Sequence, residues 1–536
     1  MFGVAALALC LWLSGCGGCD RESAATSSGR GADTPRAVRL YLMSDVAGAL
    51  EPCGCSKDQL GGLDHLAAFI ATESKRAAPH LVLASGPSFY LDPMLDADRA
   101  TQDKWKAEAI ARTLKSLGLT AFAPGYNDFA AGPAELARLA EASGGAMLGV
   151  GLGGVAVTSR KLVEQGGIKV GVFGVSDPRD LGRAPEGISP PATDQLITLV
   201  RQEVAALERE GAELLVGLVT MDRGAALRIA DAVPELDVLL VGRPVGRGAA
   251  NTAQPAPELV NGVLVVGTAN HAQTVAVVDV VATGRKGALK LADAGGVARA
   301  GQVAELSRRI RELEHRINAW EKGGTVAAAD LAARKAELAK VVAEREALTM
   351  PTAPPSGDYF RYAVEEVRER LGDDESVVSL MREYYQRVND HNKTALASLL
   401  PPKVGSGEAA YIGVDACTDC HAEERAVWDK TAHAHAYKTL ADDFKEFNLE
   451  CVGCHVTGYG KPGGSTVAHV EKLRDVQCED CHGPGSLHAA KPEKKDLIAL
   501  APDPKGCVDR CHHSPHVEGF DAKAKMELVL GPGHGK

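Results

Sequence analysis

Cysteine pairs followed by a histidine recur in the C-terminal part of the chain, as CTDCH, CVGCH, CEDCH and the one-residue-longer CVDRCH. In such a motif two thiols can add across the two vinyl groups of a haem, and the imidazole that follows binds the iron from one face. The motifs therefore predict three to four groups of covalently bound haem c. The thioether cysteines are Cys417, Cys420, Cys451, Cys454, Cys478, Cys481, Cys507 and Cys511, and the proximal iron ligands are His421, His455, His482 and His512.

Structural zinc is the alternative for paired cysteines of this spacing. A zinc motif does not need a histidine directly after every second cysteine, which favours haem in the first three motifs. The fourth motif has an extra residue in the loop that must span the vinyl groups. A disulfide between Cys507 and Cys511 therefore stays open as the alternative for this motif.

Spare histidines around the motifs predict the second axial ligands. Haem irons of electron carriers usually have such a ligand, which leaves no open position for a substrate. His534, in the GPGHGK tail, and His391, in the polar stretch NDHNK, are interpreted as surface residues. The distal candidates are His433 and His488 first, and His435, His469 and His516 after them.

Residues 441–536 are rich in Gly, Pro, Lys and His and poor in large apolar side chains. Such a segment can bury little core of its own. Covalently held porphyrins would supply the missing apolar volume. We therefore expect a mostly α, haem-packed domain.

The order of the motifs and of the residues between them is similar to that of a known protein family. Trp428 and TAHAHA follow the first motif, ECVGCHVTGYGKPGG surrounds the second and VQCEDCHGPGSLHA surrounds the third. This order resembles the tetrahaem cytochrome c family that includes the electron acceptor of hydroxylamine oxidoreductase, over about residues 413–516. The resemblance implies stacked haem pairs and electron transfer, with His433 and His488 as distal ligands. The spacing of CVDRCH departs from the family pattern.

An apolar run at residues 4–15 is typical of a signal peptide, although no Lys or Arg precedes it. Its ending, Leu13-Ser14-Gly15-Cys16, resembles a bacterial lipobox in which Cys16 is lipidated, with an ordinary cleaved signal as the alternative. Covalent haem attachment also belongs outside the cytoplasm. We expect a periplasmic or outer-membrane lipoprotein of the bacterial cell envelope. Residues 1–16 would be the signal peptide and residues 17–37 a flexible, polar tether.

Composition limits the partners. The chain has 536 residues, a net charge of -11 and only 4% aromatic residues. It offers no basic surface for nucleic acid, and it permits attraction to basic redox proteins of the cell envelope. No other apolar run reaches the roughly 18 residues of a membrane span, so membrane contact is expected only through the lipid.

Residues 38–300 alternate short apolar runs with amphipathic stretches, which predicts an α/β domain with a largely buried sheet. The segments LYLMSDVAGAL, GGLDHLAAFI, APGYNDFAAG and VDVLLVGRP resemble the metallophosphoesterase domain of secreted 5′-nucleotidases, which implies an α/β sandwich. Strands are expected at 38–44, 80–84, 146–150, 170–175, 213–219, 238–241, 264–267 and 275–281. Helices are expected at about 61–75, 103–117, 133–142, 192–210 and 222–232.

Most ligands of the two-metal site that this second resemblance implies are missing, and such a site needs nearly all of them. The family pattern is D-x-H, G-D, N-H-E, a single histidine and G-H-x-H. Asp45 remains, but Ala47, Gly86 and Met221 stand at ligand positions, Tyr126-Asn127-Asp128 replaces N-H-E, and Gly242-Arg243-Pro244 replaces G-H-x-H. The domain is therefore expected to have lost hydrolysis and to serve docking.

A Cys53-Gly54-Cys55 motif follows the first predicted strand. A disulfide between cysteines so close in sequence is strained and relatively reducible. The motif is either a thiol or metal site that faces the cytochrome, or a pair of structural cysteines, and the sequence leaves both open.

The remaining segments connect the two domains. Residues 301–350 are rich in Ala, Glu, Lys, Arg and Leu at helical spacing, with a break at Lys322-Gly323-Gly324, and predict an antiparallel helical hairpin. Residues 351–412 are expected to form a linker and two amphipathic helices, at 357–372 and 376–396. Residues 413–536 would be the cytochrome domain.

The chain is thus expected to transfer electrons rather than to act as an enzyme. The alternative is a multihaem oxidoreductase that acts on a small nitrogen or sulfur compound at an open haem iron. A phosphoesterase tethered to a cytochrome is a third hypothesis, and the missing metal ligands argue against it.

Overall fold

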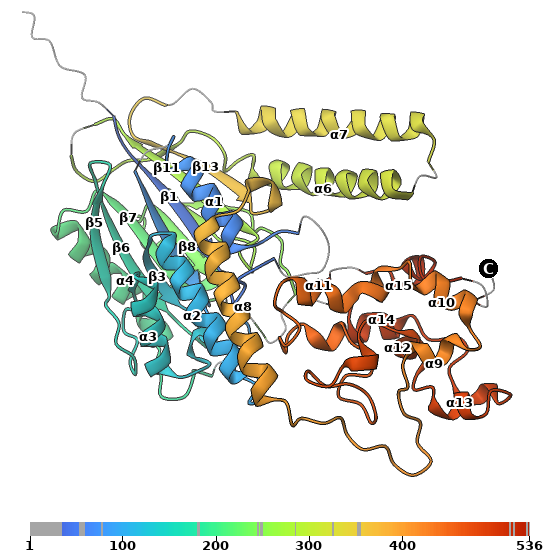
Figure 1. Cartoon of the computed structure of the whole chain (residues 1–536). Helices are drawn as coiled ribbons and strands as arrows, with labels where there is room; N and C mark the ends of the chain where they lie inside the picture. Colours follow the sequence, from blue (N-terminus) through green and yellow to red (C-terminus); the bar gives the residue numbers. More distant parts are fainter. Residues whose placement is uncertain are drawn as a thin grey trace, which may run out of the picture. The chain divides into compact units, whose positions relative to one another are not determined.

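A computed structural model describes residues 35–52, 59–76, 79–179, 183–243, 246, 250–284, 286–323, 326–350, 355–513, 516–517, 520–531 and 534 (Figure 1). The predicted signal peptide, the lipidation residue Cys16 and most of the tether lie outside these residues, as do Cys53 and Cys55. Within the described residues, no helix is both long and apolar enough to cross a membrane.

The first sheet has seven strands in the order β12-β13-β11-β1-β2-β3-β4. Neighbouring strands from β1 to β4 are parallel, while β11 runs antiparallel to both β1 and β13. The strands are β1 (Arg36–Ser44), β2 (His80–Gly86), β3 (Leu119–Pro124), β4 (Ala146–Met147), β11 (Thr274–Ala282), β12 (Ala292–Asp293) and β13 (Tyr359–Glu366).

The second sheet has six strands in the order β5-β6-β7-β8-β10-β9. Its four central strands are parallel and its two edge strands are antiparallel. The strands are β5 (Arg160–Gln165), β6 (Ile168–Ser176), β7 (Leu214–Thr220), β8 (Val238–Gly242), β9 (Glu258–Val260) and β10 (Val263–Val266).

Strand β1 shows how the layers form. Side chains alternate between the faces of a strand, so Leu40 and Leu42 enter the core between the two sheets while Tyr41 and Met43 face the helices. Helices α1 (Leu63–Glu73), α2 (Ala100–Ser116), α3 (Pro133–Ser143) and α8 (Glu375–Ala395) cover the first sheet. Helices α4 (Leu196–Arg209) and α5 (Arg223–Ala232) cover the second. The predicted α/β sandwich is confirmed, and we call this part the α/β module.

The predicted helix at 357–372 is wrong. Residues 359–366 form β13, which lies between β11 and β12 in the first sheet. Phe360, Tyr362 and Val364 alternate on one face and pack into the core between the sheets. An alternating aromatic and β-branched pattern is typical of a strand, and the charged residues around it obscured this period. The sheet is therefore completed by residues that follow the helical hairpin in sequence.

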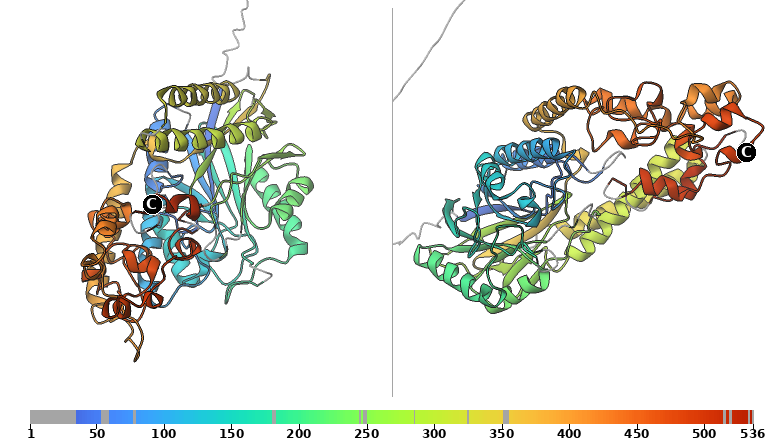
Figure 2. Two further views of the ribbon diagram at one scale, coloured as in Figure 1. Left: turned by 90° about the vertical axis from the view of Figure 1, so that its right-hand side faces the viewer. Right: turned by 90° about the horizontal axis from the view of Figure 1, so that it is seen from below.

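The helical hairpin is confirmed, with α6 at Ala300–Gly323 and α7 at Ala328–Thr349. Figure 1 and the left view of Figure 2 show the two helices side by side. Ile310, Leu313 and Val341 form the small apolar cluster between them. Arg368, which follows β13, donates to Glu314 of α6 at 3.0 Å and so ties the hairpin to the sheet.

Short helices and 3-10 turns dominate residues 413–536, as predicted. A buried apolar cluster in this part contains only Tyr437, Val452, Val456, Val467 and Val470, with a few partly buried neighbours. The helices are α9 (Val414–Thr418), α10 (Ala422–Trp428), α11 (Ala436–Asp442), α12 (Cys478–His482), α13 (Ser486–Ala490), α14 (Lys505–Arg510) and α15 (Ala522–Met526).

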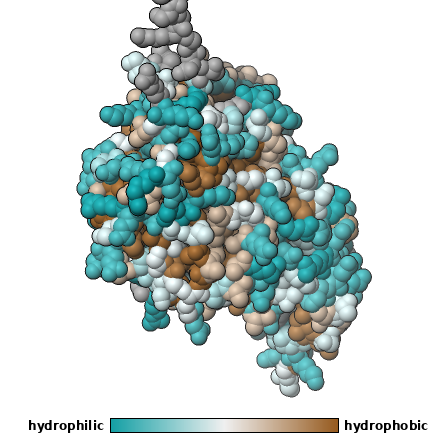
Figure 3. All heavy atoms as spheres, turned by 90° about the vertical axis from the view of Figure 1, so that its left-hand side faces the viewer, coloured by the Kyte–Doolittle hydropathy of each residue, from teal (hydrophilic) through white to brown (hydrophobic). Residues whose placement is uncertain are grey.

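On the face of the molecule that Figure 3 shows, hydrophobic side chains gather in separate small groups among hydrophilic ones. Scattered apolar side chains are normal on the surface of a folded protein. This face therefore gives no indication of a large apolar binding surface.

Candidate functional site

The four Cys-His motifs lie in two neighbouring pairs. The thiol of Cys417 in the first motif neighbours that of Cys478 in the third, and their interaction raises the pKa of Cys417 and lowers that of Cys478. The thiol of Cys454 in the second motif neighbours that of Cys511 in the fourth, and their interaction lowers the pKa of Cys454 and raises that of Cys511. All eight cysteines of these motifs are free of disulfides. The fold therefore places the attachment points of the first and third motifs side by side, and likewise those of the second and fourth.

Two acidic residues inside the third motif form hydrogen bonds with residues close to the first and second motifs. Glu479 is 1% exposed, and its carboxylate accepts hydrogen bonds from the backbone N–H groups of Gly413 and Gly485 at 2.8 and 2.7 Å. Asp480 accepts from the hydroxyl of Thr457, just after the second motif, at 2.7 Å. Buried carboxylates are stable only when they are hydrogen-bonded. These bonds hold the first and second motifs against the third.

Two proximal histidines are oriented by backbone carbonyls. Nδ1 of His455 lies 2.6 Å from the carbonyl oxygen of Ala436, and Nδ1 of His482 lies 2.6 Å from that of Ala499. Metal-binding histidines characteristically donate one ring N–H in this way, which leaves Nε2 for the metal. Burial also lowers the pKa of His455, which favours the neutral imidazole that binds a metal. Both residues fit the role of haem ligand.

Three histidine pairs have ring centres about 6 Å apart. His513 and His516, at 5.9 Å, are only three positions apart in sequence, whereas the other two pairs each join a motif histidine to a distant one. The ring centres of His433 and His512 are 6.3 Å apart, and those of His482 and His534 are 6.0 Å apart. A metal–nitrogen bond is about 2 Å and the ring centre lies about 1 Å behind the nitrogen, so two imidazoles on one iron have ring centres about 6 Å apart. Burial lowers the pKa of His433, which again favours the neutral form.

The other distal candidates differ in their surroundings. Nε2 of His469, the nitrogen that a haem ligand commonly uses, lies 2.8 Å from the carbonyl oxygen of Ala397. Nδ1 of His488 is buried and has no hydrogen-bond partner among the described residues. Burial lowers the pKa of His516, and the charge of His455 contributes to the same shift. His435 is exposed. Of these four residues, His488 and His516 fit an axial role better than His469.

Sequence reasoning missed His534, which was expected to be a surface residue. It is exposed, but its ring lies beside the proximal histidine of the third motif. Its only signal in the sequence was its residue type, because its contact with His482 bridges more than fifty positions. Long-range contacts of this kind depend on the tertiary fold.

Buried amides join the α/β module to the segment before the second motif. The side chain of Gln102 on α2 donates to Asn448 at 2.9 Å and accepts from the backbone N–H of Leu449 at 3.0 Å. The side chain of Asn392 on α8 donates to the carbonyl of Phe447 at 2.9 Å. Gln102, Asn448 and Asn392 are all buried. Fully paired buried polar networks favour one unique arrangement of the parts that they join.

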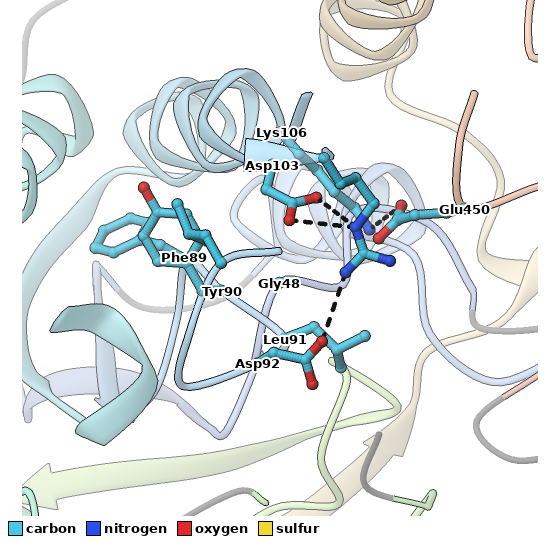
Figure 4. A pocket seen from close by; sticks show the side chains of 10 residues that line it. Gly48, Phe89, Tyr90, Leu91, Asp92, Asp103, Lys106 and Glu450 are labelled. Atoms are coloured by element: carbon cyan, nitrogen blue, oxygen red, sulfur yellow. Dashed lines mark hydrogen bonds and ion pairs between the residues drawn. The ribbon is translucent and has the colours of Figure 1, made fainter. Parts of the chain in front are cut away.

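An ionic network adjoins these amides (Figure 4). Arg99 contacts Asp103 at 3.1 Å, and Lys106 contacts Glu450, the residue before Cys451, at 2.9 Å. Burial raises the pKa of Asp103 to about 6. Burial alone would raise the pKa of Glu450, but Lys106 and Arg99 together lower it. These residues help to line a cavity of about 20 Å³, which is large enough for one water molecule.

The described residues on both sides of the Cys53-Gly54-Cys55 segment contact the cytochrome part. Glu51 accepts a hydrogen bond from Lys445 at 2.8 Å and another from the hydroxyl of Tyr385 at 2.8 Å. The side chain of Gln59 donates to the carbonyl of His516 at 3.5 Å. Cys53 and Cys55 themselves lie outside the described residues, so the thiol-site hypothesis stays untested.

Arg243 contacts the one carboxylate that the phosphoesterase resemblance retains. Asp45 is fully buried and accepts from the backbone N–H of Arg243 at 2.8 Å. Its second oxygen lies 3.4 Å from Nε of the same arginine. The guanidinium also donates to the hydroxyl of Thr252 at 2.9 Å. Burial raises the pKa of Asp45 to about 7, and Arg243 opposes this shift.

Asp128 has a structural role instead of a metal-binding one. Its carboxylate accepts the backbone N–H groups of Ser88 and Phe89, each at 2.8 Å, and that of Gly125 at 2.9 Å. Nearby, Asp45 and Ala47 have φ angles of 56° and 47°, which are strained for residues with a Cβ atom. Strained backbone persists where the surrounding fold imposes it. The local backbone is thus fixed by hydrogen bonds even though most family ligands are absent.

One other cluster could offer metal ligands. Asp64, His65 and Asp373 have ligand atoms within 4.8 Å of one another. However, Nδ1 of His65 already lies 2.8 Å from the carbonyl oxygen of Gly372 and 3.0 Å from Asp373. These contacts tie α1 to the turn before α8, and they explain the cluster without a metal.

The motifs, the oriented imidazoles and the histidine pairs together fit covalently bound haem c. Residues 416–483 match the family model of cytochrome c554 and c-prime. They contain the first three motifs and His433, and the fourth motif lies beyond them. Cytochrome c-554 of Nitrosomonas europaea is 35% identical over an alignment of 107 residues, and the match covers 17% of this chain and 46% of that protein. The C-terminal part therefore contains a cytochrome c554-like domain, and the chain spans less than half the length of this relative.

Among the solved structures similar to the chain are a 5′-nucleotidase precursor and a calcineurin-like phosphoesterase. The 5′-nucleotidase precursor from Thermus thermophilus matches with a TM-score of 0.41 at 15% identity, over 66% of this chain and 59% of that one. A calcineurin-like phosphoesterase from Bacillus subtilis matches with a TM-score of 0.40 at 15% identity, over 48% and 89% of the two chains.

Proposed function

We propose that the chain is an exported multihaem cytochrome that transfers electrons through haem c at its four motifs. The observation that supports this most directly is the pairing of the motifs through Cys417 and Cys478, and through Cys454 and Cys511. Paired attachment points bring the redox groups of two motifs close together. The histidine pairs with ring centres 6.0 and 6.3 Å apart would hold an iron between them.

The residues of the chain have three tasks in this function. The thiols of each motif hold the haem covalently, and His455 and His482 are kept in one orientation by carbonyl acceptors that raise their basicity. His433 and His534 lie near His512 and His482, so these residues would hold the haem irons from both sides and exclude a substrate there. The haem, when bound, would supply a one-electron iron couple.

Export and anchoring are part of this proposal. The signal-like run and Cys16 support a lipoprotein of the bacterial cell envelope, periplasmic or attached to the outer membrane. Redox proteins of the same compartment would be its partners, and the net charge of -11 favours basic surfaces on them.

The α/β module would act as a docking module without hydrolytic activity. Arg243 beside Asp45 and the backbone bonds of Asp128 leave little of a two-metal site. The buried amides around Gln102 instead support a role in holding the cytochrome domain. An assay with a nucleotide or phosphodiester and divalent cations should therefore give no hydrolysis. Metal-dependent turnover would contradict this part of the proposal.

The first test is to count the haems and determine their spin states in the purified protein. Pyridine haemochrome analysis should give four haems per chain, and electron paramagnetic resonance (EPR) should show low-spin iron at the motifs that have paired histidines. Cys507→Ser should lower the count by one. An unchanged count in that variant would restore the disulfide hypothesis for CVDRCH, and a chain without covalent haem would overturn the whole proposal.

The second candidate is an oxidoreductase with an open iron. Among the described residues, His421 and His455 have no second imidazole in ring contact. His421 is also exposed, with Nδ1 3.8 Å from Glu424. A high-spin iron at either motif would support reduction or oxidation of a small nitrogen or sulfur compound there.

A further inference from the structure

Cys451, the first cysteine of the second motif, lies where the α/β module meets the cytochrome domain. Burial raises the pKa of its thiol to about 12, and the charges of Glu450, Lys445 and Lys106 act on it as well. Lys106 belongs to α2. The surroundings of this haem attachment point are therefore shared between the two parts of the chain.

Two adjacent tyrosines of α8 complete these surroundings. Tyr384 and Tyr385 are 3% and 7% exposed, and their ring centres are 4.8 Å apart. Burial raises the pKa of Tyr384 far above its ordinary value, and the charges of Glu450, Asp103 and Cys451 raise it further. Its hydroxyl group is thus close enough to the second motif to interact with it electrostatically.

The two hydroxyl groups differ in their hydrogen bonds. That of Tyr385 donates to Glu51 at 2.8 Å. That of Tyr384 is buried and has no hydrogen-bond partner among the described residues. Leaving a buried hydroxyl unpaired is unfavourable, and nearly all such groups in native proteins have a partner. The bound cofactor can supply an acceptor for it.

Helix α8 also fixes the position of Tyr384 relative to Cys451. Asn389, which follows Tyr384 on α8, accepts from the backbone N–H of Phe447 at 3.1 Å, and Asn392 donates to the carbonyl of the same residue at 2.9 Å. The helix that carries the tyrosine therefore also holds the segment that leads into the second motif.

We propose that Tyr384 is a positioning residue for the haem at Cys451 and Cys454, to which its hydroxyl donates a hydrogen bond. The α/β module thereby forms one wall of the second haem site and tunes its reduction potential. This inference rests on the proposed function. A donor to the haem stabilises the electron-rich, reduced state, because hydrogen bonding is one of the means by which a protein sets a haem potential.

The test is Tyr384→Phe in the full-length haem-loaded protein, followed by a potentiometric titration monitored by EPR. Loss of one hydrogen bond should lower the ratio of reduced to oxidised iron about fivefold at a fixed potential, and at one haem only. The haem count should stay the same, because phenylalanine preserves the packing.

Tyr90→Phe is the matched control. Tyr90 is 2% exposed and its hydroxyl also has no hydrogen-bond partner among the described residues. Burial is the main cause of its raised pKa, and the nearby charges belong to residues of the α/β module, led by Glu135 and Asp128. This variant should leave every haem potential unchanged.

Two outcomes would overturn the inference. In the first, Tyr384→Phe leaves all haem potentials unchanged, which would mean that the hydroxyl of Tyr384 donates its hydrogen bond to a water molecule and not to the haem. In the second, the variant shifts the potentials of all haems equally, as a general loosening of the fold would. Both outcomes require that the haems are present and counted. They are therefore distinct from failure of the proposed function, in which no covalent haem is found.

Discussion

Whether a histidine can bind an iron depends on which of its ring nitrogens is already engaged in a hydrogen bond. Nδ1 of His482 is engaged with a carbonyl, and its ring lies 6.0 Å from that of His534. His534→Ala should therefore open one axial position and convert one low-spin haem to high spin, as measured by EPR. Added imidazole should restore the low-spin signal.

His469→Ala is the control for that variant, because Nε2 of His469 is engaged with a carbonyl oxygen. It should leave all spin states unchanged. A low-spin spectrum in His534→Ala, identical to that of the unmodified protein, would rule out the axial role of His534.

Asp45 should make stability depend on pH. Burial raises its pKa to about 7, so the folded state holds this proton more tightly than the unfolded state. Stability should then fall by about 1.4 kcal/mol for each unit of pH between about 4 and 7. Burial also raises the pKa of Asp128 and Asp237 to about 7, so Asp45→Asn should reduce the slope by about this amount in urea unfolding measured across that range, and not abolish it. The exposed Asp194→Asn should preserve the slope, and an unchanged slope in Asp45→Asn would show that Asp45 does not cause it.

At the level of elements, β13 provides the clearest test of the fold. Phe360 is 2% exposed and lies between the sheets, so Phe360→Ala should destabilise the α/β module by about 3 to 5 kcal/mol. Chemical unfolding measures this change. Tyr359→Ala, on the other face of the same strand, should cost clearly less. Equal losses in the two variants would argue against the alternating register.

The fourth motif also depends on the geometry of an element. Cys507 lies in α14 and Cys511 directly follows that helix, four positions later. Residues four apart lie on the same face of a helix. The additional residue of CVDRCH therefore does not by itself turn the two thiols away from each other, which supports its assignment as a haem site.

At the level of the whole molecule, buried amides connect the two parts. Gln102→Leu would leave the backbone N–H of Leu449 without its acceptor and would remove one of the two hydrogen bonds that the side-chain oxygen of Asn448 accepts. A buried group that loses its partner costs about 1 to 3 kcal/mol. We expect a lower unfolding temperature and faster proteolysis of residues 397–412, which connect α8 to the cytochrome domain.

Gln202→Leu, on the exposed face of α4, is the control for that variant and should change neither quantity. If Gln102→Leu is cleaved at the same rate as the unmodified protein, the amide network does not hold the two parts together. The docking role of the α/β module would then lose its main support.

The sequence by itself determined the features that depend on local chemistry. Four Cys-His motifs predicted haem because the reaction needs adjacent thiols and an imidazole, and the alternation of apolar runs with amphipathic stretches predicted an α/β domain with a largely buried sheet. The helical hairpin followed from helical spacing. These signals are encoded in neighbouring residues, so no knowledge of long-range contacts was needed.

Only the tertiary structure decided how distant residues meet. It placed His534 near His482, brought Tyr384 within electrostatic range of Cys451 and inserted β13 into a sheet that begins more than three hundred residues earlier. Such contacts depend on how the chain packs, and packing brings together residues whose sequence separation carries no periodic signal. A charged stretch such as 359–366 becomes a strand because its apolar face fits between two sheets.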